Sequence, residues 1–146
     1  PLLAVVTSIH KPHKVLVLLY GCVLFNVSCA PEPVVETTED IEIALGSRYS
    51  NYVEMINAIA DGDTIALTKF VRGWNLYDGV VYDHGWVLIQ LMEKVGDESF
   101  ASSLKSLDEK EIENVRIYIL AGIDMYSKDS SLQDKYPRSF KILKLK

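Results

Sequence analysis

Apolar side chains recur at intervals of three and four residues along most of the chain beyond residue 40. This is the period of an α-helix, in which such residues fall on one face. The first helical stretch begins at Ile41, and Gly46 and Ser47 divide it into a short piece and a main helix. The pattern predicts helices over residues 41–45, 50–60, 64–73, 77–95, around 100–104, and from 106–109 to about 127.

Polar residues at the ends of these stretches predict where the helices start and stop. Asp63, after the turn Asp61–Gly62, is expected to be the N-cap of the helix over 64–73, because Asp accepts hydrogen bonds from free helix N–H groups. Ser106 and Glu109 have the spacing of a capping box and predict the start of the last long helix. Gly96 predicts the end of the helix over 77–95.

The helix over 77–95 carries apolar side chains on two sides. One face consists of Val80, His84, Val87, Leu88, Leu91 and Val95, and the second stripe of Tyr82, Trp86 and Ile89. Asp83, Gln90 and Lys94 form a narrow polar side. A helix that is apolar on two sides is typical of the middle of a bundle. The alternative is that the aromatic stripe faces a partner.

These elements predict an all-α fold, a small bundle or array of four to five short helices with short connections. A single helical domain is expected over residues 41–146. Strands remain possible near 41–45 and in the tail, where residues 139–145 alternate weakly and fit either a strand or a last helix turn.

The first part of the chain has the three-part pattern of an export signal. A basic stretch, His10–Lys14, precedes an almost purely apolar run over residues 15–27 and the small-residue junction Ser28-Cys29-Ala30. The run is shorter than the ~20 residues that span a bilayer, so a permanent transmembrane anchor is the weaker interpretation. Residues 29–40 are polar, contain proline and predict a flexible tether.

The residues around Cys29 resemble the lipobox of bacterial lipoproteins, although Asn26 stands where that family usually has Leu. The resemblance implies that residues 1–28 are removed and that Cys29 receives lipid. It also implies the cell envelope as the location, on the periplasmic face of an outer membrane (because Ala30 follows the cysteine) or at the cell surface. An ordinary secretory signal, or a buried amino-terminal helix, is the alternative.

Charge and cysteine content narrow the range of functions. The formal net charge is −5, and residues 29–127 hold 7 Lys/Arg against 18 Asp/Glu, a net of −11. Such an acidic body argues against a nucleic-acid partner. The basic tail, residues 128–146, has a net of +4 and is expected to be solvated or to meet anionic lipid or the acidic body. With Cys22 removed and Cys29 lipidated, no thiol remains for a disulfide or a nucleophile.

His84, next to Asp83, is the only candidate for acid–base chemistry in the expected mature chain, with Asp78 as a further acid. Adjacent helical residues point about 100° apart, however, so Asp83 is poorly placed to orient the ring. His84 also lies in the centre of an apolar face. We therefore expect a core histidine that is hydrogen-bonded to a tyrosine or a carbonyl of a neighbouring helix, and we expect Gly85 to mark a close helix crossing.

No motif points to a metal or a cofactor. The turn Asp61–Asp63 lacks the acidic ladder of a calcium loop, so neither is predicted. Four aromatic residues, Trp74, Tyr77, Tyr82 and Trp86, are weak candidates for a binding surface, although burial in the core is the more common use.

The sequence thus predicts a lipid-anchored helical protein outside the cytoplasm, attached to the membrane through Cys29, that binds an envelope protein or a ligand. The alternatives are a small hydrolase that uses His84 with a nearby acid, and an inhibitor or immunity-type protein that presents its acidic face to a basic partner.

Overall fold

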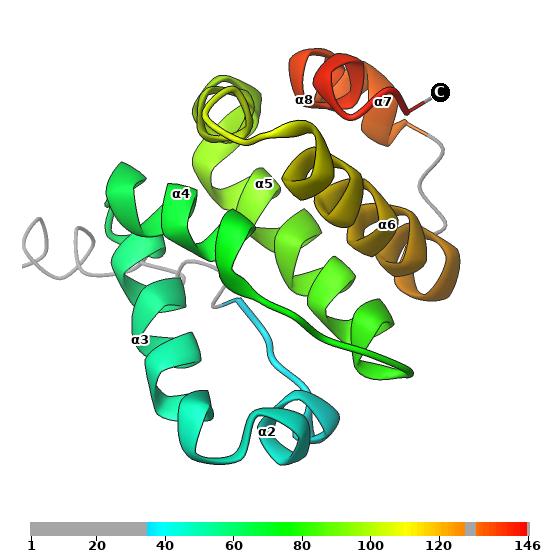
Figure 1. Ribbon diagram of the computed structural model, residues 1–146. Coiled ribbons are helices and arrows are strands. Elements are labelled where there is room, and N and C mark those ends of the chain that lie inside the picture. The colour runs from blue at the N-terminus through cyan, green and yellow to red at the C-terminus, as the bar shows by residue number, and fades with distance from the viewer. Residues whose placement is uncertain (1–34, 128–130, 146) are drawn as a thin grey trace, which may run out of the picture. The chain divides into compact units, whose positions relative to one another are not determined.

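The computed structural model describes residues 35–127 and 131–145, and these residues form an all-helical fold, as predicted (Figure 1). Val35–Lys146 is one compact unit. A 3-10 turn, η1 (Gly46–Arg48), joins the first two helices. The α-helices are α2 (Glu39–Leu45), α3 (Tyr49–Ala60), α4 (Thr64–Gly73), α5 (Val80–Leu104), α6 (Glu109–Tyr126), α7 (Leu132–Lys135) and α8 (Pro137–Ile142).

The predicted signal over residues 1–28, including Cys22, and the start of the tether with Cys29 lie outside the described residues. The tether was predicted to extend to residue 40, which is wrong for residues 35–40. Val35 is buried, and Gln90 of α5 hydrogen-bonds both the N–H and the carbonyl of Glu36, at 2.8 and 3.1 Å. Thr38 then caps α2 by accepting from the N–H of Ile41. The helical body therefore begins earlier than the hydrophobic period indicates.

The helices α3 and α4 form a hairpin whose turn is the one predicted. The carboxylate of Asp63 accepts from the N–H groups of Ile65 and Ala66, at 2.8 and 2.9 Å, and α4 has the predicted bounds. Gly62 in the turn has a φ of 95°, which favours glycine. Gly46 and Ser47 interrupt the first helical stretch, as expected, because a 3-10 turn separates α2 from α3.

The long helix α5 lies in the centre of the body, between α4 and α6 (Figure 1), and it also packs against α2, α3 and α8. Gly96 has non-helical angles (φ 79°, ψ 161°) and divides α5 into two arms, as the sequence predicted. The helix begins at Val80, because residues 77–79 belong to the preceding loop. The apolar face predicted for α5 is buried at His84, Val87, Leu88 and Leu91.

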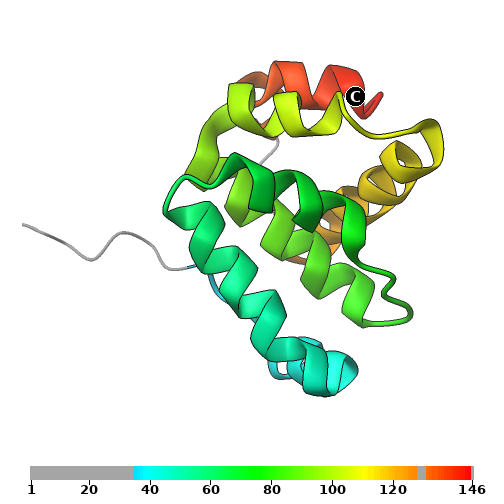
Figure 2. The ribbon, with the colours of Figure 1, turned by 60° about the vertical axis from the view of Figure 1, so that its left-hand side comes forward.

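The second arm of α5 and α8 lie side by side (Figure 2). The carboxylate of Asp97, the first residue after the kink, accepts from the N–H groups of Arg138 and Ser139, at 2.9 and 2.8 Å. Asp97 therefore caps α8 from a distant part of the chain. The tail, for which a strand and a helix were both possible, is helical through α7 and α8.

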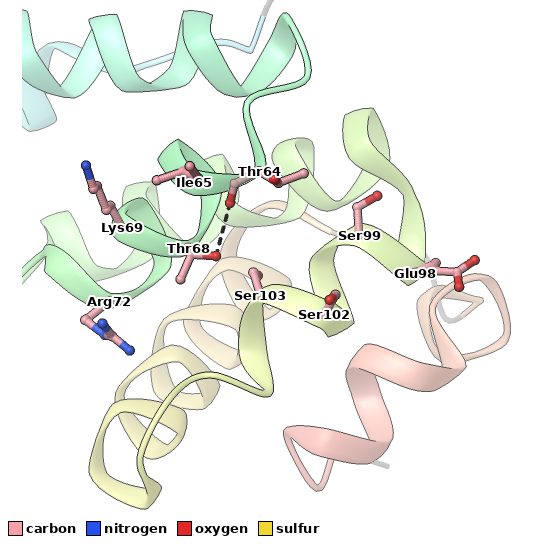
Figure 3. A pocket seen from close by; sticks show the side chains of 9 residues that line it. All are labelled: Thr64, Ile65, Thr68, Lys69, Arg72, Glu98, Ser99, Ser102 and Ser103. Carbon is pink, nitrogen blue, oxygen red and sulfur yellow. Dashed lines mark hydrogen bonds between the residues drawn. The ribbon is translucent and has the colours of Figure 1, made fainter.

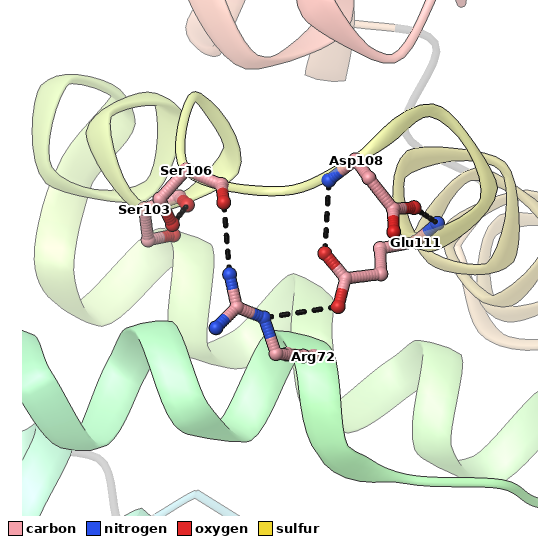
Figure 4. A network of polar contacts seen from close by, with 5 residues as sticks. All are labelled: Arg72, Ser103, Ser106, Asp108 and Glu111. Carbon is pink, nitrogen blue, oxygen red and sulfur yellow. Dashed lines mark hydrogen bonds and ion pairs between the residues drawn. The ribbon is translucent and has the colours of Figure 1, made fainter.

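The helix α6 begins two residues later than the sequence pattern indicated. Asp108 is its N-cap and forms a reciprocal capping box with Glu111 (Figure 4). The predicted cap Ser106 instead donates its hydroxyl to the carbonyl of Ser103, at 2.8 Å, at the end of α5. Two overlapping patterns, Ser-x-x-Glu and Asp-x-x-Glu, compete here, and the tight turn after α5 uses the serine.

The crossing of α5 and α6 brings their backbones into contact. A Cβ on Gly85 would lie 1.8 Å from the carbonyl oxygen of Tyr118, and one on Gly122 would lie 2.4 Å from the carbonyl carbon of Gly85. Real Cβ atoms do not approach backbone this closely, so only glycine fits at either position. The close crossing predicted for Gly85 is confirmed, and the structure shows Gly122 as its counterpart on α6.

Candidate functional site

His84 is a buried core residue, as expected, and 1% of its surface is exposed. Its Nδ1 lies 2.8 Å from the hydroxyl of Tyr52 on α3, and its ring meets the ring of Tyr118 on α6 edge-on, at 4.8 Å. Burial lowers the pKa of His84 to about 3, because a charged imidazole would lose its hydration. The imidazole is therefore neutral at physiological pH and serves as a hydrogen-bonding link between α3 and α5.

Asp83 and His84 do not form a catalytic pair. The carboxylate of Asp83 accepts a hydrogen bond from the hydroxyl of Tyr126 at the end of α6, whereas His84 bonds to Tyr52. Asp83, which was predicted to lie on the narrow polar side of the helix, is buried. Asp78 lies exposed in the loop before α5, at a φ of 55°. The residues proposed for hydrolysis are thus in three different environments.

The four candidate aromatic residues separate into two groups. Trp74 packs against the buried ring of Tyr52, at 4.7 Å between ring centroids, and its carbonyl accepts from the hydroxyl of Tyr118. Tyr77, in the same loop, is 70% exposed. Tyr82 and Trp86 lie one turn apart on α5, on the same side of the helix.

A residue that sequence reasoning did not single out for binding, Tyr126, completes the second group. Its ring stacks on that of Trp86 at a centroid distance of 5.7 Å and an angle of 28°. Tyr82 and Tyr126 are both exposed, by 39% and 41%. Tyr82, Trp86 and Tyr126 are called the aromatic surface below. No signal in the sequence pairs Tyr126 with Trp86.

Acidic groups lie next to the aromatic surface. The hydrogen bond to Asp83 and the nearby charge of Asp40 on α2 contribute to raising the pKa of Tyr126 to about 12. The hydroxyl of Tyr126 therefore stays protonated and keeps its bond to Asp83. This combination of exposed aromatic rings and carboxylates matches a positively charged partner, because cations bind the faces of aromatic rings.

A groove lies on another part of the body, between α4 and the second arm of α5 (Figure 3). It has a volume of about 630 Å³, and hydroxyl groups from both helices line it. Its lining consists of Thr64, Ile65, Thr68, Lys69, Arg72, Glu98, Ser99, Ser102 and Ser103.

Arg72 at the end of this groove is held in place by the turn between α5 and α6 (Figure 4). Its guanidinium donates to the carbonyl of Ser106 at 2.8 Å and lies 3.0 Å from the carboxylate of Glu111. The same carboxylate completes the capping box with Asp108. Arg72 therefore links α4 to the start of α6, and its role is structural.

Residues 35–127 and 131–145 contain no group of three or more His, Cys, Asp or Glu side chains that could hold a metal ion. In the same residues, no helix is both long and apolar enough to cross a membrane. In the basic tail, Arg138 of α8 pairs with Glu98 at 3.2 Å, so part of this charge meets the acidic body.

No protein-family model, curated protein or solved structure matches the chain.

Proposed function

We propose that this chain is a lipid-anchored helical protein of the bacterial cell envelope that binds a basic protein partner through the aromatic surface of Tyr82, Trp86 and Tyr126. Residues 1–28 act as the export signal in this proposal, and Cys29 becomes the lipidated first residue. The polar residues that follow connect the lipid to the helical body, which begins at Val35.

Support for the anchor comes from the order of residue types around Cys29. A basic stretch, an apolar run too short to span a bilayer, and small residues beside the cysteine follow one another over residues 10–30. A polar segment then precedes the first buried residue of the body. This arrangement would place the lipid and the folded unit at opposite ends of a short linker.

The observation that carries the binding proposal is the stack of Trp86 and Tyr126, with Tyr82 on the same side of α5, the buried Asp83 bonded to Tyr126, and the exposed Asp40 nearby. Aromatic residues are the most common energetic centres of protein interfaces. The body is strongly acidic, which favours and steers a basic partner. A catalytic function has less support, because its best candidate, His84, is buried and bonded to Tyr52.

The anchor is tested by the intact mass of the protein from the membrane fraction of a bacterium that expresses the full chain. We expect a chain that begins at Cys29 and carries at least a diacylglycerol group. The variant Cys29→Ala should leave an unprocessed precursor or a chain released from membranes. A full-length, unlipidated chain in the wild type would contradict the anchor and return Cys22 and Cys29 to the candidates for functional groups.

The binding surface is tested by photo-crosslinking in the same cells, with a photoreactive amino acid in place of Tyr82 or, as a control, of Ile65. Ile65 is also exposed, by 67%, but lies on α4. We expect a basic protein to be crosslinked at position 82 but not at position 65, and Trp86→Ala to abolish the product. Equal crosslinking at both positions, or no effect of Trp86→Ala, would contradict this surface.

A further inference from the structure

A second cleft, between α3 and α4 at the end near η1, contains no acidic side chain in its lining. Its volume is about 590 Å³, and Ser47, Arg48, Asn51, Met55, Lys69, Gly73 and Trp74 line it. This composition contrasts with that of residues 29–127 as a whole, in which Asp and Glu outnumber Lys and Arg by 18 to 7. The local charge in the cleft is therefore opposite to that of the body as a whole.

Two cations from different elements line this cleft. Arg48 belongs to the turn η1 before α3, and Lys69 is on α4, where it also contributes to the lining of the hydroxyl-lined groove (Figure 3). Within residues 35–127 and 131–145, neither side chain takes part in an ion pair, whereas Arg72, Arg116 and Arg138 each pair with a glutamate. Unpaired cations that face one cleft repel each other unless an anion lies between them.

The cleft also offers one accessible neutral N–H donor, the side-chain amide of Asn51, and is bordered by Trp74. The indole Nε1 of Trp74 is buried and has no hydrogen-bond partner in the described part of the chain. Among the residues that the structure describes, the amide Nδ2 of Asn51 hydrogen-bonds only to the sulfur of Met55, a weak acceptor, at 3.9 Å. Because its indole nitrogen is covered by protein atoms, Trp74 borders the cleft through the rest of its side chain and does not donate to a ligand there.

We propose that this cleft binds the phosphate group of a small molecule, held by Arg48 and Lys69 with the side-chain amide of Asn51 as a neutral donor. Two unpaired positive charges match a doubly charged group better than a single carboxylate. The planar guanidinium of Arg48 also presents two parallel N–H groups to phosphate oxygens. This site is separate from the aromatic surface and does not depend on the lipid anchor.

The site is tested by NMR on the full chain, ¹⁵N-labelled at tryptophan and kept in detergent micelles. The chain has two tryptophans, so the spectrum holds two indole N–H signals, which the variant Trp86→Phe assigns. We expect inorganic phosphate, added at constant ionic strength, to shift the signal of Trp74 in a saturable way. The signal of Trp86 should not move, and chloride should have no such effect.

Charge-matched variants separate the site from a general charge effect. Arg48→Gln and Lys69→Gln should each weaken phosphate binding about tenfold, as expected for the loss of one charge-assisted hydrogen-bonding group. Lys105→Gln removes the same charge from an exposed position outside the cleft and should leave binding unchanged. An equal loss in all three variants, or no saturable shift in the wild type, would overturn the proposal.

A second titration, with glycerol 3-phosphate, identifies the source of the phosphate group. Tighter binding of glycerol 3-phosphate than of inorganic phosphate supports a phosphate ester, such as a headgroup or a sugar phosphate, as the natural ligand. Tighter binding of inorganic phosphate supports the free ion. If neither compound shifts the signal of Trp74, the cleft is not a phosphate site.

Discussion

Gly85 of α5 and Gly122 of α6 lie against each other so closely that the backbone N–H and C=O groups of the two helices are in contact. A Cβ on either residue would lie less than 3 Å from backbone atoms of the other helix. Because the two helices are this close, two tyrosines of α6 reach residues of other elements. Tyr118 donates its hydroxyl to the carbonyl of Trp74, and Tyr126 donates its hydroxyl to the carboxylate of Asp83. The glycine pair therefore positions both the loop before α5 and the aromatic surface.

The glycine crossing predicts a large loss of stability in Gly85→Ala. Because the new methyl group would clash with rigid backbone, we expect the free energy of unfolding to fall by about 3 kcal/mol or more, measured by urea denaturation. Gly79→Ala is the matched control, because Gly79 has angles that alanine adopts (φ −55°, ψ −32°) and open space around it. Similar losses in both variants would contradict the close crossing.

The burial of His84 predicts a specific pH dependence. Its pKa is about 3 in the folded protein, whereas in the unfolded chain it takes the usual value of 6.5. The unfolded state therefore binds more protons between these values, and the stabilisation, complete above pH 6.5, is lost as the pH falls toward 3. The contribution of His84 should fall by about 1.4 kcal/mol per pH unit within this window.

The measurement is the ring C–H signal of His84 in NMR, followed from pH 8 down to the lowest pH at which the protein stays folded. We expect no titration between pH 8 and 5, the range in which a solvent-exposed imidazole titrates. A midpoint between 6 and 7 for His84 would contradict its burial and would make it available again for acid–base chemistry.

The bond between Tyr126 and Asp83 predicts that Tyr126→Phe costs about 1–3 kcal/mol of stability, because a buried carboxylate loses its partner. Tyr82→Phe removes an exposed hydroxyl that makes no hydrogen bond in the described residues, and it should change stability by less than about 0.5 kcal/mol. Thermal unfolding of the two variants gives the comparison. Equal melting temperatures would show that Asp83 does not depend on Tyr126.

The capping of α8 by Asp97 predicts that Asp97→Ala lowers the free energy of unfolding by about 1–2 kcal/mol, a typical cost for a lost N-cap. Despite the cost of desolvation, its hydrogen bonds with Ser139 and Arg138 and the charge of Arg138 lower the pKa of Asp97. This stabilisation is present above its usual pKa and is lost as the pH falls through the lowered value. Urea denaturation at pH 7 and pH 3 checks both points.

The exposed Asp124 provides the control for this cap. Asp124→Ala removes the same charge from the surface of α6, where the carboxylate caps no helix, and should change stability by less than about 0.5 kcal/mol. If both aspartate variants lose the same stability, the effect is one of net charge and not of capping.

Local patterns were sufficient to predict the helices whose ends are set by neighbouring residues. Asp63 caps α4 from the adjacent position, and Gly96 ends the first arm of α5 through its own backbone freedom. Where two local patterns overlapped, as at Ser106 and Asp108, only the folded turn decided which residue caps α6. The core position of His84 also followed from the sequence, because its neighbours at helical spacing are apolar.

Contacts between distant residues were decided by the tertiary structure alone. Residues 35–40 belong to the body because Gln90, far along the chain, satisfies the backbone of Glu36. Trp86 meets Tyr126, and Arg48 and Lys69 line one cleft, because of how whole helices cross. Periodicity determines which face of a helix is apolar, but the crossing of helices determines which side chains meet, and that depends on packing summed over the whole body.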